Sequence, residues 1–273
     1  MRSNDSCSGW ATRPTATDSQ SRELRCLRSG RVIHTGLRRT WTSSEWGASA
    51  IREVEETIRA ICKVEGNDGI LFDGESVEGT RIKEEDEYEG VRLKLHAVLA
   101  GARIPMQVDI GFGDAVYPEP ELASFPVLLP MEPPVIRAYP REAAIAEKLN
   151  AMVVLDIRNS RMKDFYDIWF MANTWNFEMA TLRDAIQTSF ERRGVGIPQD
   201  VPFALTEEFL GDPQKTRQWN AFVSRLYPGS DSPSLEEVGV LLRAFLLPCI
   251  LSVPAGESAA HYWTPGLRWS EQQ

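Results

Sequence analysis

The stretch Tyr139–Trp175, YPREAAIAEKLNAMVVLDIRNSRMKDFYDIWFMANTW, organises the rest of the chain. Apolar residues recur at helical spacing after Pro140, and they recur again after the pair Asn159 and Ser160. The spacing predicts two helices joined by a short polar elbow. Asn159 and Ser160 are residue types that cap helices, so the second helix is expected to begin just after them.

Charged residues lie beside the apolar stripes of both predicted helices. Lys148 borders the stripe of the first helix, and Asp164 lies at the edge of the apolar face of the second. Asp167 is expected further round the second helix, towards solvent. This placement suggests a polar cleft between packed helices, although spacing by itself does not prefer the cleft to an ordinary capped helix. The alternative is a capped helix whose first-turn acids interact with the helix dipole, and pairing of Lys148 with Asp164 requires the two helices to pack face to face.

Upstream, two segments show the alternation of half-buried strands. Apolar and charged residues alternate over 91–99, a turn is predicted at 100–102, and the alternation resumes over 106–110. The two strands are expected to pair. Asp109 would then point to the face opposite Val108 and Ile110, away from the core. The alternative is an ordinary acid on an edge strand.

These blocks, in this order, resemble the AbiEii/AbiGii-type nucleotidyltransferase toxins of type IV toxin–antitoxin and abortive-infection systems. The resemblance covers about residues 51–251. It is carried by the runs RAYPRE (137–142), AEKL (146–149), NSRMKDFYD (159–167) and, upstream, VDIGFGD (108–114).

The resemblance implies an α+β fold: a nucleotidyltransferase-like, polymerase-β-type mixed sheet with flanking helices, followed by a helical C-terminal half. It implies transfer of a nucleotide from an NTP to an acceptor hydroxyl on tRNA, with Mg²⁺ as cofactor and a cognate antitoxin protein as partner. In such enzymes three carboxylates on neighbouring strands hold the metal ions.

The resemblance also implies roles for individual residues. Asp109 matches the third metal-binding carboxylate. Lys148 would hold the triphosphate, because an ammonium group suits anionic oxygens. Asp164 would orient the nucleotide or the acceptor, or tune Lys148. Among the substrate-binding residues, positive charge for phosphate or RNA would come from Arg161 and Lys163, while Asp167 would cap the helix and orient its neighbours.

The N-terminal segment departs from this pattern. Residues 1–47 hold eight arginines, no lysine and three tryptophans, without any helical or strand periodicity. The segment also lacks the Asp-x-Asp motif that the family carries ahead of its first helix, so two of three metal ligands are missing. A disordered basic arm, a transit peptide and a frame error in the gene model are the open interpretations, and we favour the frame error.

Codon arithmetic supports that interpretation. In a frame shifted by one step, the last base of each codon joins the first two bases of the next codon. Tryptophan is always TGG and threonine codons always begin with AC, so Trp41-Thr42 gives GAC, which encodes aspartate. Arg39-Thr40 also gives aspartate if the arginine codon ends in G, and Thr40-Trp41 permits leucine. The shifted frame can therefore read Asp-Leu-Asp, and the nucleotide sequence decides the matter.

The chain is expected to fall into four parts. These are the irregular segment 1–47, a strand-rich part 48–135, a helical part 136–251 and a loose tail 252–273 that contains several prolines and glycines.

Finer features are expected within these parts. In the strand-rich part, Asp73-Gly74 predicts a turn between two strands, and prolines set residues 117–134 as an extended connector. In the helical part, Gly194 would cap a helix over 179–190, and Ser234 with Glu237 predicts a capping box.

Composition limits the class of protein. A chain of 273 residues, 42% hydrophobic and 25% charged, is ordinary for a soluble globular protein, with no run of about 18 apolar residues that could span a membrane. Its four cysteines are scattered, which suits the cytoplasm. Its three histidines are far apart in the sequence, so any metal would be held by carboxylates. The net charge of −9 argues against sequence-independent coating of nucleic acid, although it allows a local basic groove.

Two other functions stay open. The chain could be a catalytically dead toxin relic that only binds its antitoxin. It could also be a metal-dependent phosphohydrolase using Asp109, Asp114, Asp164 and Asp167, which would consume NTP without labelling an acceptor.

Overall fold

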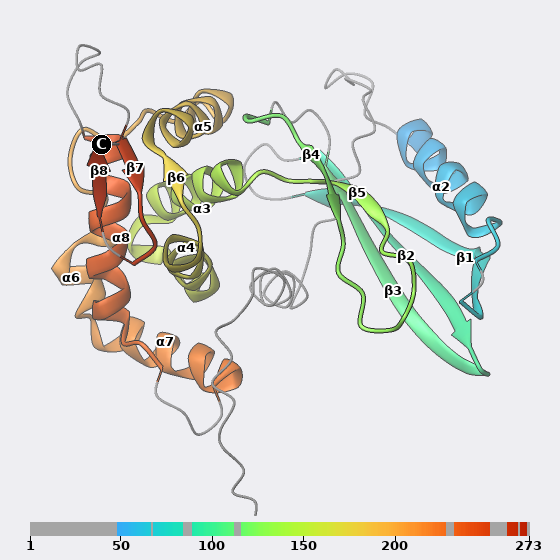
Figure 1. The fold of residues 1–273 in the computed structure, drawn as a ribbon. Coiled ribbons are helices and arrows are strands. Elements are labelled where there is room, and N and C mark those ends of the chain that lie inside the picture. The colour runs from blue at the N-terminus through green and yellow to red at the C-terminus, as the bar shows by residue number, and fades with distance from the viewer. Residues whose placement is uncertain are drawn as a thin grey trace, which may run out of the picture.

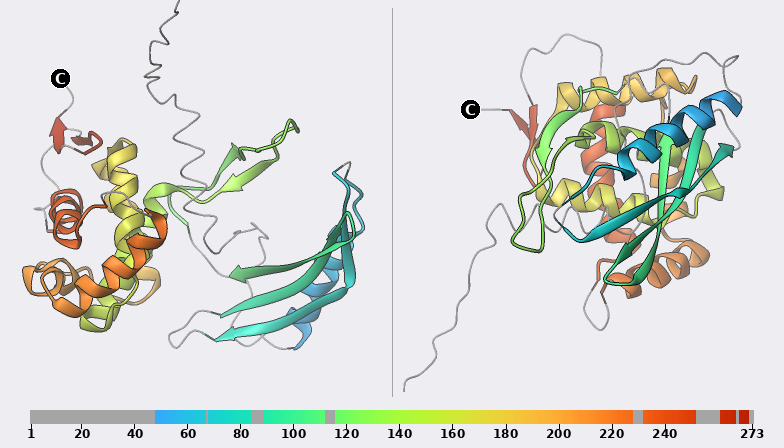
Figure 2. Two further views of the ribbon diagram at one scale, coloured as in Figure 1. Left: turned by 90° about the horizontal axis from the view of Figure 1, so that it is seen from below. Right: turned by 90° about the vertical axis from the view of Figure 1, so that its right-hand side faces the viewer.

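The structure is a computed structural model, and it describes residues 48–66, 68–83, 89–111, 116–227, 232–251, 261–266 and 268–271. The predictions for the segment 1–47 and for Asp114 lie outside these residues. The described part is an α+β arrangement of helices and small antiparallel sheets. Figures 1 and 2 show a three-stranded sheet with one helix on one side of the molecule and a group of helices on the other.

The first unit is an antiparallel sheet covered on one face by a helix. Its elements are α2 (Ala48–Cys62), β1 (Ile70–Lys83), β2 (Glu89–Leu99) and β3 (Ala102–Gly111). The strand order is β1-β2-β3, and apolar side chains of the sheet pack against α2. Together with Val54 of α2, the sheet residues Val77, Val91, Leu93, Leu95 and Ile110 form a small separate core.

The predicted strand pair is confirmed. Asp109 lies opposite Arg92, and Ile110, on the covered face, is buried. The turn between the strands places Ala100 at φ 49° and Gly101 at φ 84°, both in the left-handed region that tight hairpin turns require.

The turn predicted at Asp73-Gly74 is wrong, because β1 continues through it with a shift in register between Asp73 and Glu78. Side chains satisfy the backbone at this irregularity. The Ser76 hydroxyl donates to the Asp73 carbonyl at 2.7 Å and accepts from the His96 amide at 2.9 Å, so the pairing with β2 is bridged rather than broken.

The connector also contains more structure than expected. Strand β4 (Glu121–Ser124) lies within it and pairs in an antiparallel two-stranded sheet with β5 (Val135–Ala138), which directly follows the connector. All strand pairings among the described residues are antiparallel, so the mixed sheet that we expected is not seen in this part of the chain.

The helical half contains the larger core. Its principal helices are α3 (Arg141–Leu155), α4 (Met162–Thr174), α5 (Met179–Arg192), α7 (Pro213–Leu226) and α8 (Leu235–Ile250), with short elements η1 (Asp156–Arg158), η2 (Phe203–Leu205) and α6 (Glu207–Leu210) between them. Helix α3 packs on α5 and α4, and α4 also packs on α8 and α7. Many of the buried side chains are aromatic, among them Phe165, Phe190, Phe209, Trp219 and Phe245.

Local signals at the helix ends are confirmed. Gly194 follows α5 with φ 61°, as a left-handed residue after a helix. The Ser234 hydroxyl accepts from the Glu237 amide, and the Glu237 carboxylate accepts from the Ser234 amide, which completes the capping box of α8. None of the helices in the described part is long and apolar enough to cross a membrane.

The prediction of a loose tail is wrong for residues 261–266 and 268–271. Strands β7 (His261–Trp263) and β8 (Trp269–Glu271) join the short strand β6 (Phe177–Glu178) in a small antiparallel sheet. Trp263 is fully buried, and its indole N–H donates to the Ala172 carbonyl at 2.7 Å. Pro265 and Gly266 therefore lie in the connection between β7 and β8.

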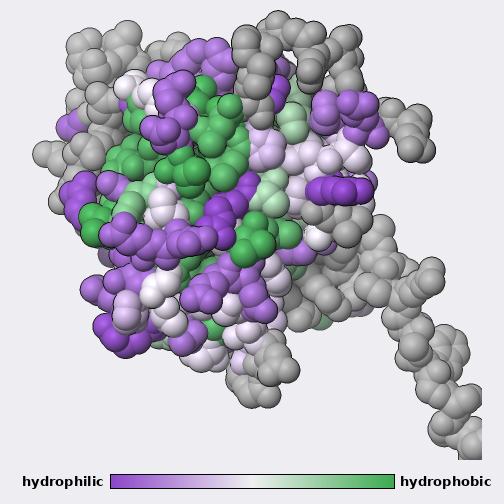
Figure 3. All heavy atoms as spheres, turned by 90° about the vertical axis from the view of Figure 1, so that its left-hand side faces the viewer, coloured by the Kyte–Doolittle hydropathy of each residue, from purple (hydrophilic) through white to green (hydrophobic). Residues whose placement is uncertain are grey.

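The outer face of the helical half is partly apolar. Figure 3 views the molecule from the side on which α8 lies in Figure 1, and hydrophobic side chains gather there among polar ones. On α8, Val240 is exposed, and Leu251 is exposed just after the helix ends.

Candidate functional site

The two central helices bring together a cluster of two lysines and two aspartates, which we call the α3–α4 cluster. The Lys148 ammonium on α3 lies 2.8 Å from Asp164 Oδ1 and 2.7 Å from Asp167 Oδ2, both on α4. Lys163 Nζ also contacts Asp167 Oδ2, at 2.5 Å. The two helices therefore pack so that Lys148 does pair with Asp164, which the sequence left open.

The local sequence explains how these side chains converge. Ile145, Leu149 and Met152 on α3 are fully buried, and they fix the helix so that Lys148 at the edge of their stripe faces α4. Asp164 and Asp167 are one turn apart, so both reach the same ammonium group.

The position of Asp167 corrects our expectation that it points towards solvent. Its side chain is only 9% exposed, less than the side chain of Asp164 at 15%. The helical wheel assumed a single buried face, whereas α4 contacts three helices, α3, α7 and α8. Asp167 therefore lies inside the cluster, where it serves both lysines.

The electrostatics of the cluster favour a charged lysine. Burial opposes the positive charge of Lys148, but the carboxylates of Asp167 and Asp164 outweigh it and raise the pKa of the ammonium above its ordinary value. Lys148 therefore stays protonated at neutral pH. With 22% of its side chain exposed, it can still be reached from solvent.

Arg161 lies just outside the cluster. It occupies the N-cap position of α4, where its side chain makes no capping bond, and it is exposed. Neither Asn159 nor Ser160 is the N-cap residue, so the predicted cap is wrong. Asn159, two residues before Arg161, instead accepts from the Arg161 amide through Oδ1 at 2.8 Å, in the turn that leads into the helix. The guanidinium of Arg161 therefore lies at the entrance to α4, close in sequence to Lys163.

Asp109 is bound by Arg92 of the neighbouring strand β2 and does not belong to the α3–α4 cluster. Its two oxygens accept from Arg92 Nε and Nη2 at 2.8 and 2.9 Å, and Gln107 donates to both at 3.2 Å. Lys148 in turn bonds Asp164 and Asp167, so the described residues do not bring Asp109 and the α3–α4 cluster into one hydrogen-bonded group. Asp109 does point away from the α2-covered core, as predicted.

The described residues do not by themselves fit a magnesium ion. In this part of the chain, no three Asp, Glu, His or Cys side chains converge as metal ligands. Magnesium takes an octahedral set of oxygens and is bound through one or more carboxylates. Asp109 offers a single carboxylate that Arg92 already neutralises in a bidentate ion pair, so we derive no chemical step through a metal from these residues.

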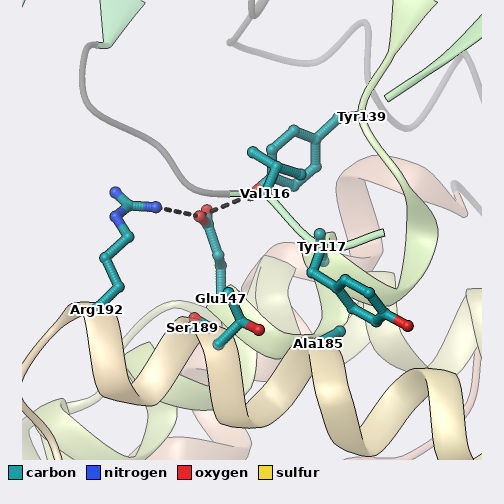
Figure 4. Close-up of a pocket in the computed structure, with 9 residues that line it drawn as sticks. Val116, Tyr117, Tyr139, Glu147, Ala185, Ser189 and Arg192 are labelled. Carbon is teal, nitrogen blue, oxygen red and sulfur yellow. Dashed lines mark hydrogen bonds and ion pairs between the residues drawn. The ribbon is translucent and has the colours of Figure 1, made fainter. Parts of the chain in front are cut away.

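A second polar group, which our sequence reasoning missed, lies on the other side of α3. The Tyr139 hydroxyl donates to Glu147 Oε1 at 2.7 Å, and Arg192 of α5 lies 3.6 Å from the same oxygen. Figure 4 shows these side chains around a hollow that Tyr117 and Ser189 also line. The adjacent residues Glu147 and Lys148 thus face different helices. In the sequence, the position of Glu147 next to Lys148 in the AEKL run was the one feature that could have marked Glu147 as part of a polar group.

The hollow beside Glu147 is small. Its volume is about 10 Å³, which is room for one water-sized molecule, whereas pockets for small organic ligands measure hundreds of Å³. Glu147 therefore takes part in a polar contact between α3, α5 and the segment before α3, and the hollow does not form a nucleotide pocket in this conformation.

One of the three comparisons with known proteins finds a match, and it is to a family. The family model described as "Nucleotidyl transferase AbiEii toxin, Type IV TA system" matches residues 47–239, a range that holds the sheet, the α3–α4 cluster and most of the helical half. No curated protein and no solved structure matches the chain. On the family match, the chain belongs to the AbiEii nucleotidyl transferase toxins of type IV toxin–antitoxin systems.

Proposed function

We propose that the chain is built as a toxin nucleotidyltransferase that transfers a nucleotide from an NTP to an acceptor hydroxyl on tRNA. The observation that carries the proposal is the α3–α4 cluster, in which Lys148, with its raised pKa, lies between Asp164 and Asp167. All three residues belong to the runs that resemble the family, and all lie within the range that the family model matches.

The cluster suits the binding of a triphosphate. A protonated lysine attracts anionic phosphate oxygens, and the two carboxylates keep its ammonium group oriented before the substrate arrives. When a phosphate approaches, it can replace one carboxylate as the partner of Lys148. Lys163, with 33% of its side chain exposed, and the exposed Arg161 add positive charge at the same end of α4 for the nucleotide or the RNA.

We also propose different tasks for the two acids of the cluster. Among the described residues, Asp164 forms an ion pair with Lys148 alone, so it can turn to a ribose or acceptor hydroxyl without leaving a second lysine unpaired. Asp167 contacts both lysines and is the more buried, so it holds them in place. We therefore assign Asp164 to substrate orientation and Asp167 to the positioning of Lys148 and Lys163.

The metal step is the part that the chain as spelled does not supply. The family resemblance implies Mg²⁺ with Asp109 as one ligand, and the other two carboxylates would belong to an Asp-x-Asp motif that this sequence lacks. We propose that this polypeptide binds NTP but does not transfer it. A version whose frame is corrected over residues 29–45 would do both.

A second candidate is that the chain acts only as a binding partner of its antitoxin. Two observations favour it: no metal-ligand cluster forms within the described part of the chain, and large apolar side chains are exposed on and around the β4–β5 hairpin. These are Leu122, Leu128, Leu129, Met131, Val135 and Ile136. The phosphohydrolase alternative is less supported, because Asp164 and Asp167 are paired with lysines and Asp109 is paired with Arg92.

The experiment compares three proteins with NTPs labelled at the α-phosphate and total tRNA. These are the chain as spelled, the frame-corrected chain, and the frame-corrected chain with Lys148→Met. We expect label on tRNA only from the frame-corrected chain with Lys148 intact. Equal incorporation by the first two proteins would overturn the proposal about the missing motif. Full activity of the Lys148→Met variant would overturn the role of the cluster.

The relic hypothesis needs a separate measurement. A pull-down with the product of the neighbouring gene, together with no transfer by the frame-corrected chain, would favour the binding-only function.

A further inference from the structure

Lys215 is a buried lysine with an unusual set of partners. It lies in the first turn of α7, and only 7% of the residue is exposed. Its ammonium donates to the Ile157 and Asn159 carbonyls at 2.7 Å each, and it lies 4.9 Å from the centre of the Phe209 ring. No carboxylate in the described part of the chain lies within ion-pairing distance of Lys215.

These partners locate the contact on the elbow between α3 and α4. Ile157 and Asn159 belong to the connector that follows α3 and precedes α4, and the connector begins with Asp156 at φ 47°. A non-glycine residue in the left-handed region is strained, so surrounding contacts must hold it there. Lys215, from a helix more than fifty residues further along the chain, supplies two of those contacts.

A continuous chain of hydrogen bonds links Lys215 to the α3–α4 cluster. Lys215 donates to the Asn159 carbonyl, and the Asn159 side chain accepts from the Arg161 amide. The Arg161 carbonyl accepts from the Asp164 amide at 2.9 Å, and the Asp164 carboxylate accepts from Lys148 at 2.8 Å. Each link fixes the backbone or side chain that makes the next one.

Lys215 is itself held firmly. The Asp212 carboxylate accepts from the amides of Gln214 and Lys215 at 2.8 Å each, which fixes the first turn of α7. Burying an ammonium group without a carboxylate is unfavourable, and an apolar side chain of the same length would fill the space without that cost. The ammonium instead contributes directional hydrogen bonds. It fixes two carbonyls of the elbow, and the ring of Phe209 lies beside it.

We propose that Lys215 is a positioning residue that clamps the α3–α4 elbow and thereby sets the distance between Asp164 and Lys148. It does not touch the substrate. Its relevance to nucleotide transfer rests on the proposed function, whereas its effect on the cluster can be measured without any reaction.

The test uses Lys215→Met in the full chain, with Arg217→Met as the matched control. Methionine keeps an unbranched apolar side chain and removes the ammonium. Arg217 is an exposed cation on the same helix, and within the described part of the chain the contacts to the Ile157 and Asn159 carbonyls come from Lys215 instead. Two quantities are measured in the folded proteins: hydrogen exchange of the Arg161 and Asp164 amides, and the NMR titration of lysine side chains labelled with ¹³C and ¹⁵N.

We expect the Arg161 and Asp164 amides to exchange at least roughly tenfold faster in Lys215→Met than in Arg217→Met, because a charge-assisted contact that holds the elbow is lost. The titration midpoint of Lys148 should fall towards that of an ordinary lysine, because Asp164 is no longer held against it. A residue that merely supports α7 would lower stability and leave the titration midpoint of Lys148 unchanged.

A folded Lys215→Met protein with parental exchange at Arg161 and Asp164 and parental titration of Lys148 would overturn the proposal. If Lys215→Met does not fold, Lys215→Gln, which retains one hydrogen-bond donor, takes its place. Failure of both to fold while Arg217→Met folds would also reject the proposal, because Lys215 would then be a requirement of the fold itself. Since neither readout uses nucleotide or RNA, a failure of the proposed transferase function leaves this test intact.

Discussion

The substitution Asp167→Asn tests whether one buried carboxylate holds both lysines of the α3–α4 cluster. In the structure Asp167 Oδ2 contacts Lys148 at 2.7 Å and Lys163 at 2.5 Å, and its side chain is 9% exposed. Asparagine has nearly the same shape, so the change removes the negative charge with little change in packing. Lys148 then keeps Asp164 as its remaining carboxylate, and Lys163 loses the only ion-pair partner found for it in the described residues.

The expected loss lies between two limits. Exposed ion pairs contribute about 0–1 kcal/mol, and removing one partner of a buried pair costs about 3–5 kcal/mol. Asp167 is almost buried, while Lys148 and Lys163 are 22% and 33% exposed. We therefore expect Asp167→Asn to lower the free energy of unfolding by about 2–3 kcal/mol at pH 7.

The stability difference between the parent and Asp167→Asn should change with pH in a defined direction. The pKa of Lys148 is raised in the folded protein above its ordinary value of 10.5, chiefly by Asp167 and Asp164 acting against burial. A raised lysine pKa contributes stability that is fully present below the unfolded pKa, and this stability is lost as the pH rises through the folded pKa. The difference in stability between the parent and Asp167→Asn should therefore persist from pH 7 to pH 9 and shrink above about pH 10.5.

The assay is urea unfolding followed by circular dichroism, with Asp200→Asn as the control. Asp200 is an exposed acid in the same helical half, so its substitution should change stability by less than about 0.5 kcal/mol. The reasoning is refuted if Asp167→Asn is no less stable than Asp200→Asn at pH 7. It is also refuted if the difference between the two variants is the same at pH 11 as at pH 7.

Three further predictions concern the helical half. Ser234→Ala should lower stability by about 1 kcal/mol, because the Glu237 amide loses its capping oxygen, and urea unfolding that shows no change would contradict the capping box. Trp263→Ala should cost about 3–5 kcal/mol by the same assay, because a fully buried ring is lost from beside Phe245; a change below about 1 kcal/mol would mean that the C-terminal strands do not dock. Burial raises the pKa of Cys249 to about 12, so its thiol should resist iodoacetamide at pH 8 in the folded protein and react after unfolding, as peptide mass spectrometry can measure; rapid labelling of the folded protein would contradict this burial.

Local patterns in the sequence determined much of the architecture. The two central helices, the hairpin that carries Asp109 and the capping box at Ser234 all follow from periodicity or from capping residues, which depend only on neighbours within one or two turns. The order of the sequence runs likewise indicated the family, which the matched range 47–239 confirms.

Tertiary structure alone decided which charged side chains meet. A helical wheel placed Asp167 towards solvent, because it could not show that three other helices surround α4. The residue patterns around Lys215 and Trp263 likewise do not indicate that Lys215 contacts the elbow or that Trp263 is buried against the helical core. These contacts join residues that are far apart in the chain, and their geometry depends on how whole helices pack, which residue spacing within one helix does not specify.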